Sequence, residues 1–205
     1  MLATTSSGSA LDLDEVPPLP VRRFSVVEYR RMIELGLFDD DERFELLEGW
    51  IVPKMVRNPS HDVTIELTHE ALRGFLPEGW RVRNQFATTT ADSEPEPDLI
   101  VVRGVPRDYL DHHPGPLETA LVIEVADSSL VRDRGVKRRL YARAGYPVYW
   151  IINLGTARVE VYTDPTGPDA NPAYRLVLEF GVEDSVPLVI DGREVGRLPV
   201  RDLLP

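Results

Sequence analysis

Two acidic residues stand in apolar segments of the sequence where water would solvate them poorly. Asp98 directly precedes the apolar run 99–102, and Glu124 lies inside the run 121–126. Short aliphatic runs bounded by proline, glycine and aspartate are typical of buried strands. An ionised carboxylate in a buried strand is unfavourable by several kcal/mol unless a positive group pairs with it. A divalent metal ion would pair with both acids at once, and such an ion can activate water to cleave a phosphodiester bond.

A lysine further along the chain has the spacing to join these acids. Residues 131–144 have a helical pattern that a glycine and a proline end. On a 3.6-residue period Lys137 shares a face with aliphatic and aromatic residues, so it points toward whatever the helix packs on. A lysine on the buried side of a helix needs a counter-charge, and Glu124 lies in the strand just before this helix. We therefore predict a contact between Lys137 and Glu124, in which the lysine could position an attacking water.

Each of these residues also has a purely structural interpretation. Asp98 could cap the beginning of its strand, and Glu124 could form a buried ion pair with an arginine. Lys137 could lie along apolar surface and reach water. For His61, on the apolar stripe of a predicted helix, a helix-start or packing role is favoured over metal ligation. The arginines of 131–144 are expected to form a solvated face.

The composition is that of an ordinary globular protein and excludes several kinds of site. The 205 residues are 42% hydrophobic and 28% charged, which suits a single domain with a sizeable core. There is no cysteine, so disulfides and thiolate metal sites are excluded while oxygen ligands remain available. The net charge of −11 argues against a protein that coats nucleic acid. An enzyme could still meet DNA through one local basic patch and a bound cation.

The sequence favours a cytoplasmic protein without a membrane partner. No apolar run approaches the length of a membrane span, and residues 1–10 have neither a basic region nor a hydrophobic core. Residues 1–20 are rich in small polar residues and then in proline, so we expect a disordered tail. Residues 21–205 are predicted to form one domain with a C-terminal β extension.

The remaining pattern predicts helices alternating with strands. Ser25 and Glu28 form a capping box for a helix that ends near residue 35, and Ser60 is expected to cap a second helix over 61–76. The order of elements favours an α/β domain with a mixed central β-sheet flanked by helices, in which the last strands complete the margin of the sheet. Strands are predicted over residues 43–47, 50–56, 80–89, 98–102, 121–126, 148–153, 158–163, 174–180 and 186–190.

Several motifs together resemble a known family. They are Pro97-Asp98, Val-Ile-Glu-Val at 122–125, and Arg-Asp-Arg-Gly-x-Lys-Arg-x-Leu-Tyr-Ala-Arg-Ala-Gly at 132–145, followed by Pro-Val-Tyr-Trp at 147–150. This combination is similar to the Uma-two family of restriction endonucleases, which is assigned to the PD-(D/E)XK nuclease superfamily. The resemblance implies a restriction-endonuclease-like fold with an αβββαβ core, and DNA as the substrate.

The resemblance also implies a set of site residues. Asp98 and Glu124 would be the ligands of Mg²⁺ or Mn²⁺. Glu45, in the family signature Phe-Glu-Leu-Leu-Glu-Gly at 44–49, would be a further acidic residue of the site, although it could also be an outward-facing strand residue. His61 matches a family histidine without an assigned role.

One departure from the superfamily pattern concerns the lysine. It should lie two residues after the glutamate, where this chain has Ala126, and Lys137 in the following helix fits in its place. We therefore expect a Mg²⁺- or Mn²⁺-dependent endonuclease that hydrolyses DNA. Two alternatives stay open: a catalytically inactive nuclease fold that serves as a binding or interaction module, and a hydrolase of some smaller phosphoester. The apolar C-terminal hairpin could also support a homodimer.

Overall fold

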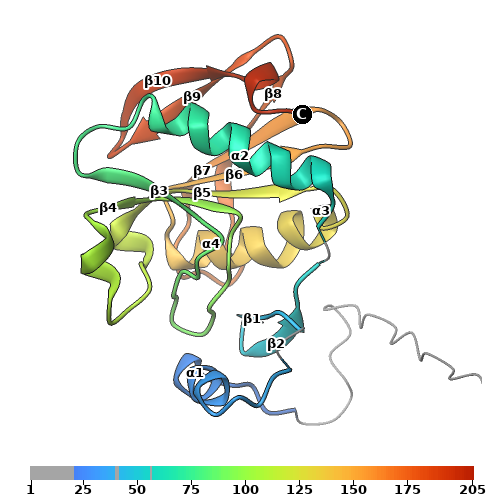
Figure 1. Cartoon of the computed structure of the whole chain (residues 1–205), viewed down its shortest axis with the longest axis vertical. Coiled ribbons are helices and arrows are strands. Elements are labelled where there is room, and N and C mark those ends of the chain that lie inside the picture. The colour runs from blue at the N-terminus through green and yellow to red at the C-terminus, as the bar shows by residue number, and fades with distance from the viewer. Residues whose placement is uncertain (1–20, 40–41, 56) are drawn as a thin grey trace, which may run out of the picture.

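The structure of the protein is a computed structural model, shown in Figure 1. It describes residues 21–39, 42–55 and 57–205. The disordered tail predicted for residues 1–20 lies outside the described residues. No helix in the described part of the chain is long and apolar enough to cross a membrane.

A six-stranded mixed sheet forms the centre of the molecule, as the sequence predicts. Its strand order is β3-β4-β5-β6-β7-β8, and only β5 and β6 run parallel. A parallel pair requires a crossover connection, and the helical segment between β5 and β6 provides it. The strands are β3 (Trp80–Asn84), β4 (Leu99–Arg103), β5 (Thr119–Ala126), β6 (Val148–Asn153), β7 (Arg158–Pro165) and β8 (Tyr174–Gly181).

The crossover is one continuous helical segment whose middle has a different pitch. It consists of α3 (Leu130–Arg132), a π-helical turn (Asp133–Lys137) and α4 (Arg138–Ala144). The predicted boundaries agree with this segment, and Gly145 ends it with a φ of 84°. The π turn was not predicted. Such turns are rare and are often found at functional sites.

The two N-terminal helices begin with side-chain caps. α1 (Val26–Glu34) has the predicted capping box of Ser25 and Glu28. α2 (Pro59–Arg73) is capped by Asn58, whose Oδ1 accepts a hydrogen bond from the His61 amide at 3.0 Å. The prediction that Ser60 caps α2 was therefore wrong. Proline suits the first helical position, where its missing N–H would have no partner, so the cap moves to the residue before it.

Two hydrophobic cores lie on the two faces of the sheet. One face packs against α2 and a two-stranded sheet of β9 (Ser185–Ile190) and β10 (Arg193–Pro199). The other face packs against α4, and Figure 1 shows α2 and α4 on opposite sides of the strands. Every second residue of β9 is buried, so one side of β9 is apolar and packs against the face of the central sheet. Of the last strands predicted to complete the margin of the central sheet, β8 does so, whereas the prediction was wrong for β9 and β10.

The remaining described elements lie outside the central sheet. β1 (Phe44–Leu47) and β2 (Trp50–Pro53) form a separate hairpin, which lies beside α1 at one end of the molecule in Figure 1. The strand predicted over 80–89 ends at Asn84, because Gln85 adopts a left-handed φ of 55° that cannot continue a strand. Short 3₁₀ turns occupy Pro106–Tyr109, Pro116–Glu118 and Val200–Asp202.

Candidate active site

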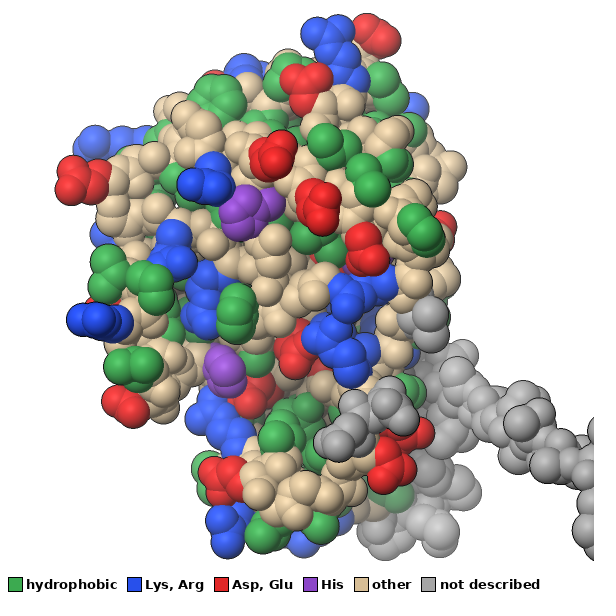
Figure 2. All heavy atoms as spheres, viewed as in Figure 1, with side chains coloured by type: hydrophobic (Ala, Val, Ile, Leu, Met, Phe, Trp, Pro, Cys, Tyr) green, Lys and Arg blue, Asp and Glu red, His purple; other side chains and the backbone are tan. Residues whose placement is uncertain are grey.

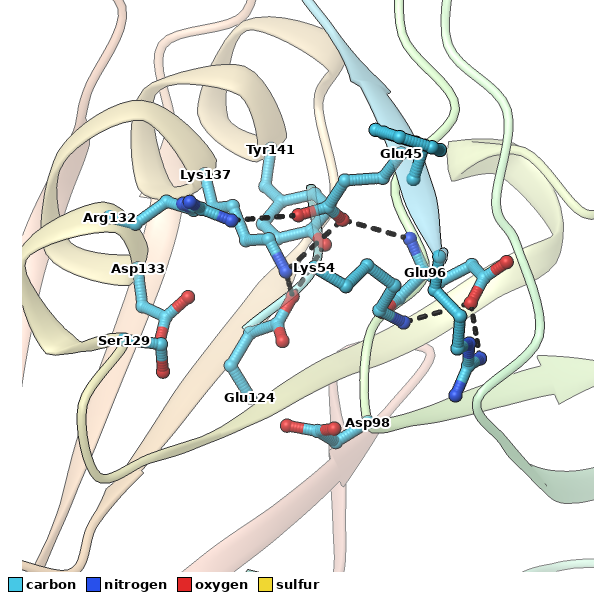
Figure 3. Close-up of polar contacts among 12 residues, drawn as sticks. Glu45, Lys54, Glu96, Asp98, Glu124, Ser129, Arg132, Asp133, Lys137 and Tyr141 are labelled. Carbon is cyan, nitrogen blue, oxygen red and sulfur yellow. Dashed lines mark hydrogen bonds and ion pairs between the residues drawn. The ribbon is translucent and has the colours of Figure 1, made fainter. Parts of the chain in front are cut away.

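Two adjacent strands bring Asp98 and Glu124 together. Leu99 of β4 pairs with Ile123 of β5 in an antiparallel arrangement. Asp98, one residue before Leu99, therefore lies opposite Glu124, one residue after Ile123, and the two acids share one face. Asp98 is 9% exposed and Glu124 is 3% exposed. One oxygen of Asp98, Oδ2, accepts a hydrogen bond from the Val125 amide at 2.8 Å. Figure 3 shows both carboxylates below the crossover helix.

Lys137 reaches these acids from the π turn. Its Nζ donates a hydrogen bond to Oε1 of Glu124 at 2.9 Å, so the predicted contact is confirmed. The lysine side chain is 7% exposed, which excludes the interpretation in which it runs along the surface to water. Tyr141, one turn later, donates its hydroxyl to the same oxygen of Glu124 at 2.9 Å. Glu124 therefore pairs with a lysine and not with an arginine.

Glu45 of β1 approaches the same lysine from the opposite side. Its Oε2 lies 3.4 Å from Nζ of Lys137 and accepts a hydrogen bond from the Glu96 amide at 3.3 Å. Its other oxygen lies 3.8 Å from a guanidinium nitrogen of Arg132. Glu45 is 1% exposed, so it is not an outward-facing strand residue. The β1–β2 hairpin thus contributes a third carboxylate to the group, as Figure 3 shows.

Asp133 is a fourth buried carboxylate, and the sequence did not single it out. It lies in the π turn with 1% exposure, and its Oδ2 accepts a hydrogen bond from the Ser129 hydroxyl at 2.6 Å. Burial raises its pKa to about 6, despite the nearby charge of Lys137. The signal that could have found it is its spacing, one helical turn before Lys137.

His61, at the beginning of α2, contacts Asp98. Its Nε2 lies 3.2 Å from Oδ2 of Asp98. Burial favours the neutral ring, but the Asp98 carboxylate outweighs this effect and raises the pKa of His61. Its Nδ1 is buried and has no hydrogen-bond partner among the described residues. His61 therefore lies at the start of its helix, as one of the favoured roles predicts, but its ring contacts an acid in addition to packing.

The buried carboxylates outnumber the buried cations around Lys137. Burial raises the pKa of Glu124 to about 8, although the Lys137 ammonium acts in the opposite direction. Burial also acts to raise the pKa of Asp98, but His61, the Val125 amide and Lys137 together hold it below its usual range. The surrounding acids outweigh burial at Lys137 and raise its pKa. The group therefore holds more acids than buried cations, and Glu124 keeps a proton that an added cation could replace.

These side chains line one cavity, which also receives Lys54, Arg57 and Arg132. Its volume is about 50 Å³. Because one water molecule needs roughly 10–15 Å³ of such space, the cavity has room for an ion with a few water molecules. The cavity is partly open, so small ligands have a path to the acids.

The oxygen donors of the cavity determine which metal ion it could hold. Among the described residues, no group of three or more histidine and acidic side chains has the geometry of a metal site. Mg²⁺, however, is commonly held by one or two carboxylates, with water and substrate phosphate completing its shell. Within the described chain no hydrogen bond reaches Oδ1 of Asp98 or Oε2 of Glu124. Two hard oxygen donors are thus available in a cavity whose acids outnumber its cations, and they fit Mg²⁺ or Mn²⁺.

The arginines of the crossover helix do not form the expected solvated face. Arg139 and Arg143 pair with Glu48 at the turn of the β1–β2 hairpin, at 2.8 and 3.3 Å. Arg143 also binds Asp92, at 2.7 Å. Their charge is used to attach the hairpin, and with it Glu45, to the crossover helix.

Comparison with known proteins agrees with this architecture. A family model named Uma2 and described as "Putative restriction endonuclease" matches residues 26–201. The crystal structure of a putative nuclease belonging to DUF820 from Anabaena variabilis ATCC 29413 is similar, with a TM-score of 0.63 and 19% sequence identity. The similarity covers 83% of this chain and 94% of that one. Comparison with curated proteins gave no match.

The structural similarity confirms the predicted restriction-endonuclease-like fold with a mixed central sheet. The family model covers most of the chain, including both strands and the helix that carry Asp98, Glu124 and Lys137. The chain belongs to the Uma2 family, described as putative restriction endonucleases.

Proposed function

We propose that this protein is a Mg²⁺- or Mn²⁺-dependent endonuclease that hydrolyses DNA phosphodiester bonds. One observation carries the proposal: Lys137, Glu124 and Asp98 converge in a cavity whose acids outnumber its cations. Membership of a family described as putative restriction endonucleases supports the nuclease class.

Asp98 and Glu124 would hold the metal ion through the oxygens that make no hydrogen bond within the described chain. When bound, such an ion lowers the pKa of a coordinated water and offsets charge on the phosphate. Asp98 is fixed for this task by the Val125 amide and by His61. Glu124 is fixed by Lys137 and Tyr141, which both bind its other oxygen.

Lys137 would act as a fixed positive charge. The acids around it raise its pKa, so it keeps its proton at neutral pH and cannot serve as a general base. Its ammonium can donate a hydrogen bond to the attacking water and stabilise negative charge that develops on the phosphate. Glu45 holds the ammonium from the other side at 3.4 Å and acts as a positioning residue.

The proposed DNA substrate is compatible with a net charge of −11 because the cations are grouped locally. Figure 2 shows Lys and Arg side chains in two groups on the face that carries α2, with acidic side chains between and around them. Lys54, Arg57 and Arg132 line the cavity, where they could contact phosphates on either side of the cleaved bond.

The proposal can be tested with plasmid DNA and Mn²⁺. The wild-type protein is expected to nick or cut the DNA, and Asp98→Asn and Lys137→Gln are expected to abolish cleavage. The matched control is Glu160→Gln, which alters an equally buried strand glutamate outside the cavity. Undiminished cleavage by Asp98→Asn or Lys137→Gln would refute the assignment of the site.

A second candidate is a nuclease fold that binds a partner without catalysis. The observation that favours it is the lack, among the described residues, of a metal-binding group of three or more side chains. Calorimetry with Mn²⁺ separates the two candidates. Binding by the wild type that Asp98→Asn removes and Glu160→Gln retains supports the hydrolase, whereas wild-type protein that binds no Mn²⁺ supports the module.

A further inference from the structure

One margin of the central sheet carries apolar side chains that no described segment covers. β8 is last in the strand order, and no described strand pairs with its outer edge. Leu176, Val177 and Leu178 are 58%, 49% and 58% exposed. Side chains alternate along a strand, so Leu176 and Leu178 lie on one face and Val177 on the other. β8 is therefore apolar and exposed on both faces.

The opposite margin of the same sheet has a different character. β3 carries Arg81 and Arg83 in alternation, and its central apolar residue, Val82, is 7% exposed. Charged side chains on an edge strand discourage pairing with other chains, whereas a long apolar edge is a template for it. The β8 margin thus differs from the β3 margin in having three consecutive exposed aliphatic residues.

The sequence of β8 is complementary to itself when read in the opposite direction. Around Val177 it runs Arg175-Leu176-Val177-Leu178-Glu179. In an antiparallel pair of two copies centred on Val177, each Leu176 lies opposite the partner's Leu178. Each Arg175 then lies opposite the partner's Glu179. Aliphatic and opposite-charge pairs are the favourable cross-strand combinations.

The two charged residues remain accessible for such pairing. The side chains of Arg175 and Glu179 are 57% and 51% exposed. Each has an ion-pair partner on β7, Asp164 for Arg175 and Arg158 for Glu179. Exposed ion pairs of this kind are weak, so they do not prevent a second contact on the outer side of the strand.

We propose that β8 is the self-association edge of this protein, where two copies pair antiparallel about a twofold axis at Val177. We identify the partner strand as β8 of a second copy. Arg175 and Glu179 lie at equal distances from Val177, so an antiparallel copy places opposite charges across from each other. The two six-stranded sheets would join into one. Directly opposed residues of an antiparallel pair share a face, so the α4-bearing faces of both copies come to the same side. The inference does not depend on nuclease activity.

The first test is the mass of the full chain in solution, measured by light scattering or sedimentation over a range of micromolar concentrations. A dimer is expected for the wild type. Val177→Lys places two ammonium groups together at the twofold axis and is expected to give monomers. Val27→Lys is the matched control, because Val27 lies on α1 and is 76% exposed, and it should remain dimeric. Circular dichroism verifies that both variants are folded.

The second test uses charge reversal. Arg175→Glu and Glu179→Arg each bring like charges together, and each should weaken self-association about tenfold. The double variant restores both opposite-charge pairs and should associate like the wild type. A mixture of the two single variants should form heterodimers, because each reversed side chain then meets an opposite charge.

Three results would overturn the proposal. The wild type could be monomeric at every concentration, Val177→Lys could dimerise as well as the wild type, or the double variant could associate as weakly as the single variants. The second result would place the dimer contact on another surface. The third would show that Arg175 and Glu179 do not face each other across the interface.

Discussion

Two glutamates in one row across the central sheet have opposite electrostatic surroundings. Ile151 of β6 pairs with Glu124 of β5 on one side and with Glu160 of β7 on the other. Both glutamates are 3% exposed, and each accepts a hydrogen bond from a tyrosine and from a cation of the crossover helix. The comparison thus holds residue type, solvent exposure and sheet position nearly constant.

Glu160 is fully paired. Arg134 donates to both of its oxygens, at 2.6 Å from Nη2 to Oε1 and 2.9 Å from Nε to Oε2. Tyr162 and Asn153 donate to it as well, at 2.6 and 3.3 Å. Burial acts to raise its pKa, but these donors outweigh burial and hold the pKa below its usual range. One acid is matched by one guanidinium.

Glu124 is only partly paired. Lys137 and Tyr141 both donate to Oε1, and Lys137 is shared with Glu45. Burial raises the pKa of Glu124 to about 8. The two glutamates therefore differ in the number of cations per acid, and burial acts more strongly on Glu124, which lies deeper in the protein. A balanced pair is a structural element, whereas an excess of acids leaves a place for a proton or a metal ion.

Removing the cation from each pair gives the largest expected difference. Lys137→Met should reduce the free energy of unfolding by about 3–5 kcal/mol, because it leaves the buried carboxyl groups of Glu124 and Glu45 without their shared cation. Arg134→Met should reduce it by only about 1 kcal/mol, because the Arg134 side chain is 45% exposed and water can replace it. Urea unfolding measures both values. Equal losses would show that the two pairs do not differ in this respect.

Replacing each acid by its amide separates function from structure. Glu124→Gln should lower Mn²⁺-dependent DNA cleavage by about 10²–10³-fold, the loss typical when a group that stabilises transition-state charge is removed. Glu160→Gln should leave the cleavage rate within a few-fold of the wild type, because Glu160 does not line the cavity. Initial rates at saturating Mn²⁺ measure the effect. A similar loss in both variants would assign Glu124 to the scaffold.

The two acids should also make opposite contributions to the pH dependence of stability. Between the ordinary glutamate pKa and about 8, folded Glu124 holds a proton that the unfolded chain releases. Its stabilisation is present at low pH and is lost as pH rises through this window. Glu160 has a lowered pKa, so its stabilisation is lost as pH falls.

Urea unfolding at several pH values between about 5 and 9 measures this contrast. The free energy of unfolding of the wild type should contain a component that falls with rising pH. Glu124→Gln should reduce that component without removing it, because Asp133 and His61 also have raised pKa values, and Glu160→Gln should retain it in full. Identical pH profiles for the two variants would contradict the raised pKa of Glu124.

The hydroxyl donors give the smallest expected effect. Tyr141→Phe and Tyr162→Phe each remove one hydrogen bond and should each cost about 1 kcal/mol in unfolding free energy. Tyr141→Phe should also raise the pKa of Glu124 further, since a hydrogen bond to the ionised form favours that form. Carboxyl ¹³C chemical shifts measured during a pH titration report the pKa. An unchanged or lower pKa in Tyr141→Phe would contradict this role for the hydroxyl.

The elements that carry the site could be predicted because their local patterns are strong. Unbroken aliphatic runs identified β4 and β5, and the 3.6-residue period placed Lys137 on the inner face of the crossover helix. Since that helix directly follows β5, the contact between Lys137 and Glu124 followed from short connections. Glu45 was predicted only from the family resemblance. Its strand lies far from the other site residues in the sequence, so local spacing could not connect it to them.

The contacts that were missed are those between segments far apart in the sequence. His61 meets Asp98 only because α2 begins next to β4, and a single helix pattern cannot show this. The partners of Arg139 and Arg143 lie on the β1–β2 hairpin, so a helix viewed alone made these arginines look solvated. The π turn that holds Asp133 and Lys137 also escaped prediction, since an apolar period does not distinguish π from α geometry over one turn.

The sequence by itself determined which segments are strands and helices, and that Asp98, Glu124 and Lys137 point into the interior. These properties depend on neighbours within a few residues, where the spacing of apolar side chains is decisive. Only the tertiary structure decided how many cations each buried acid receives. That number depends on side chains from the β1–β2 hairpin, α2 and the crossover helix meeting around one cavity. The acids there are buried, so each unmatched charge shifts a pKa.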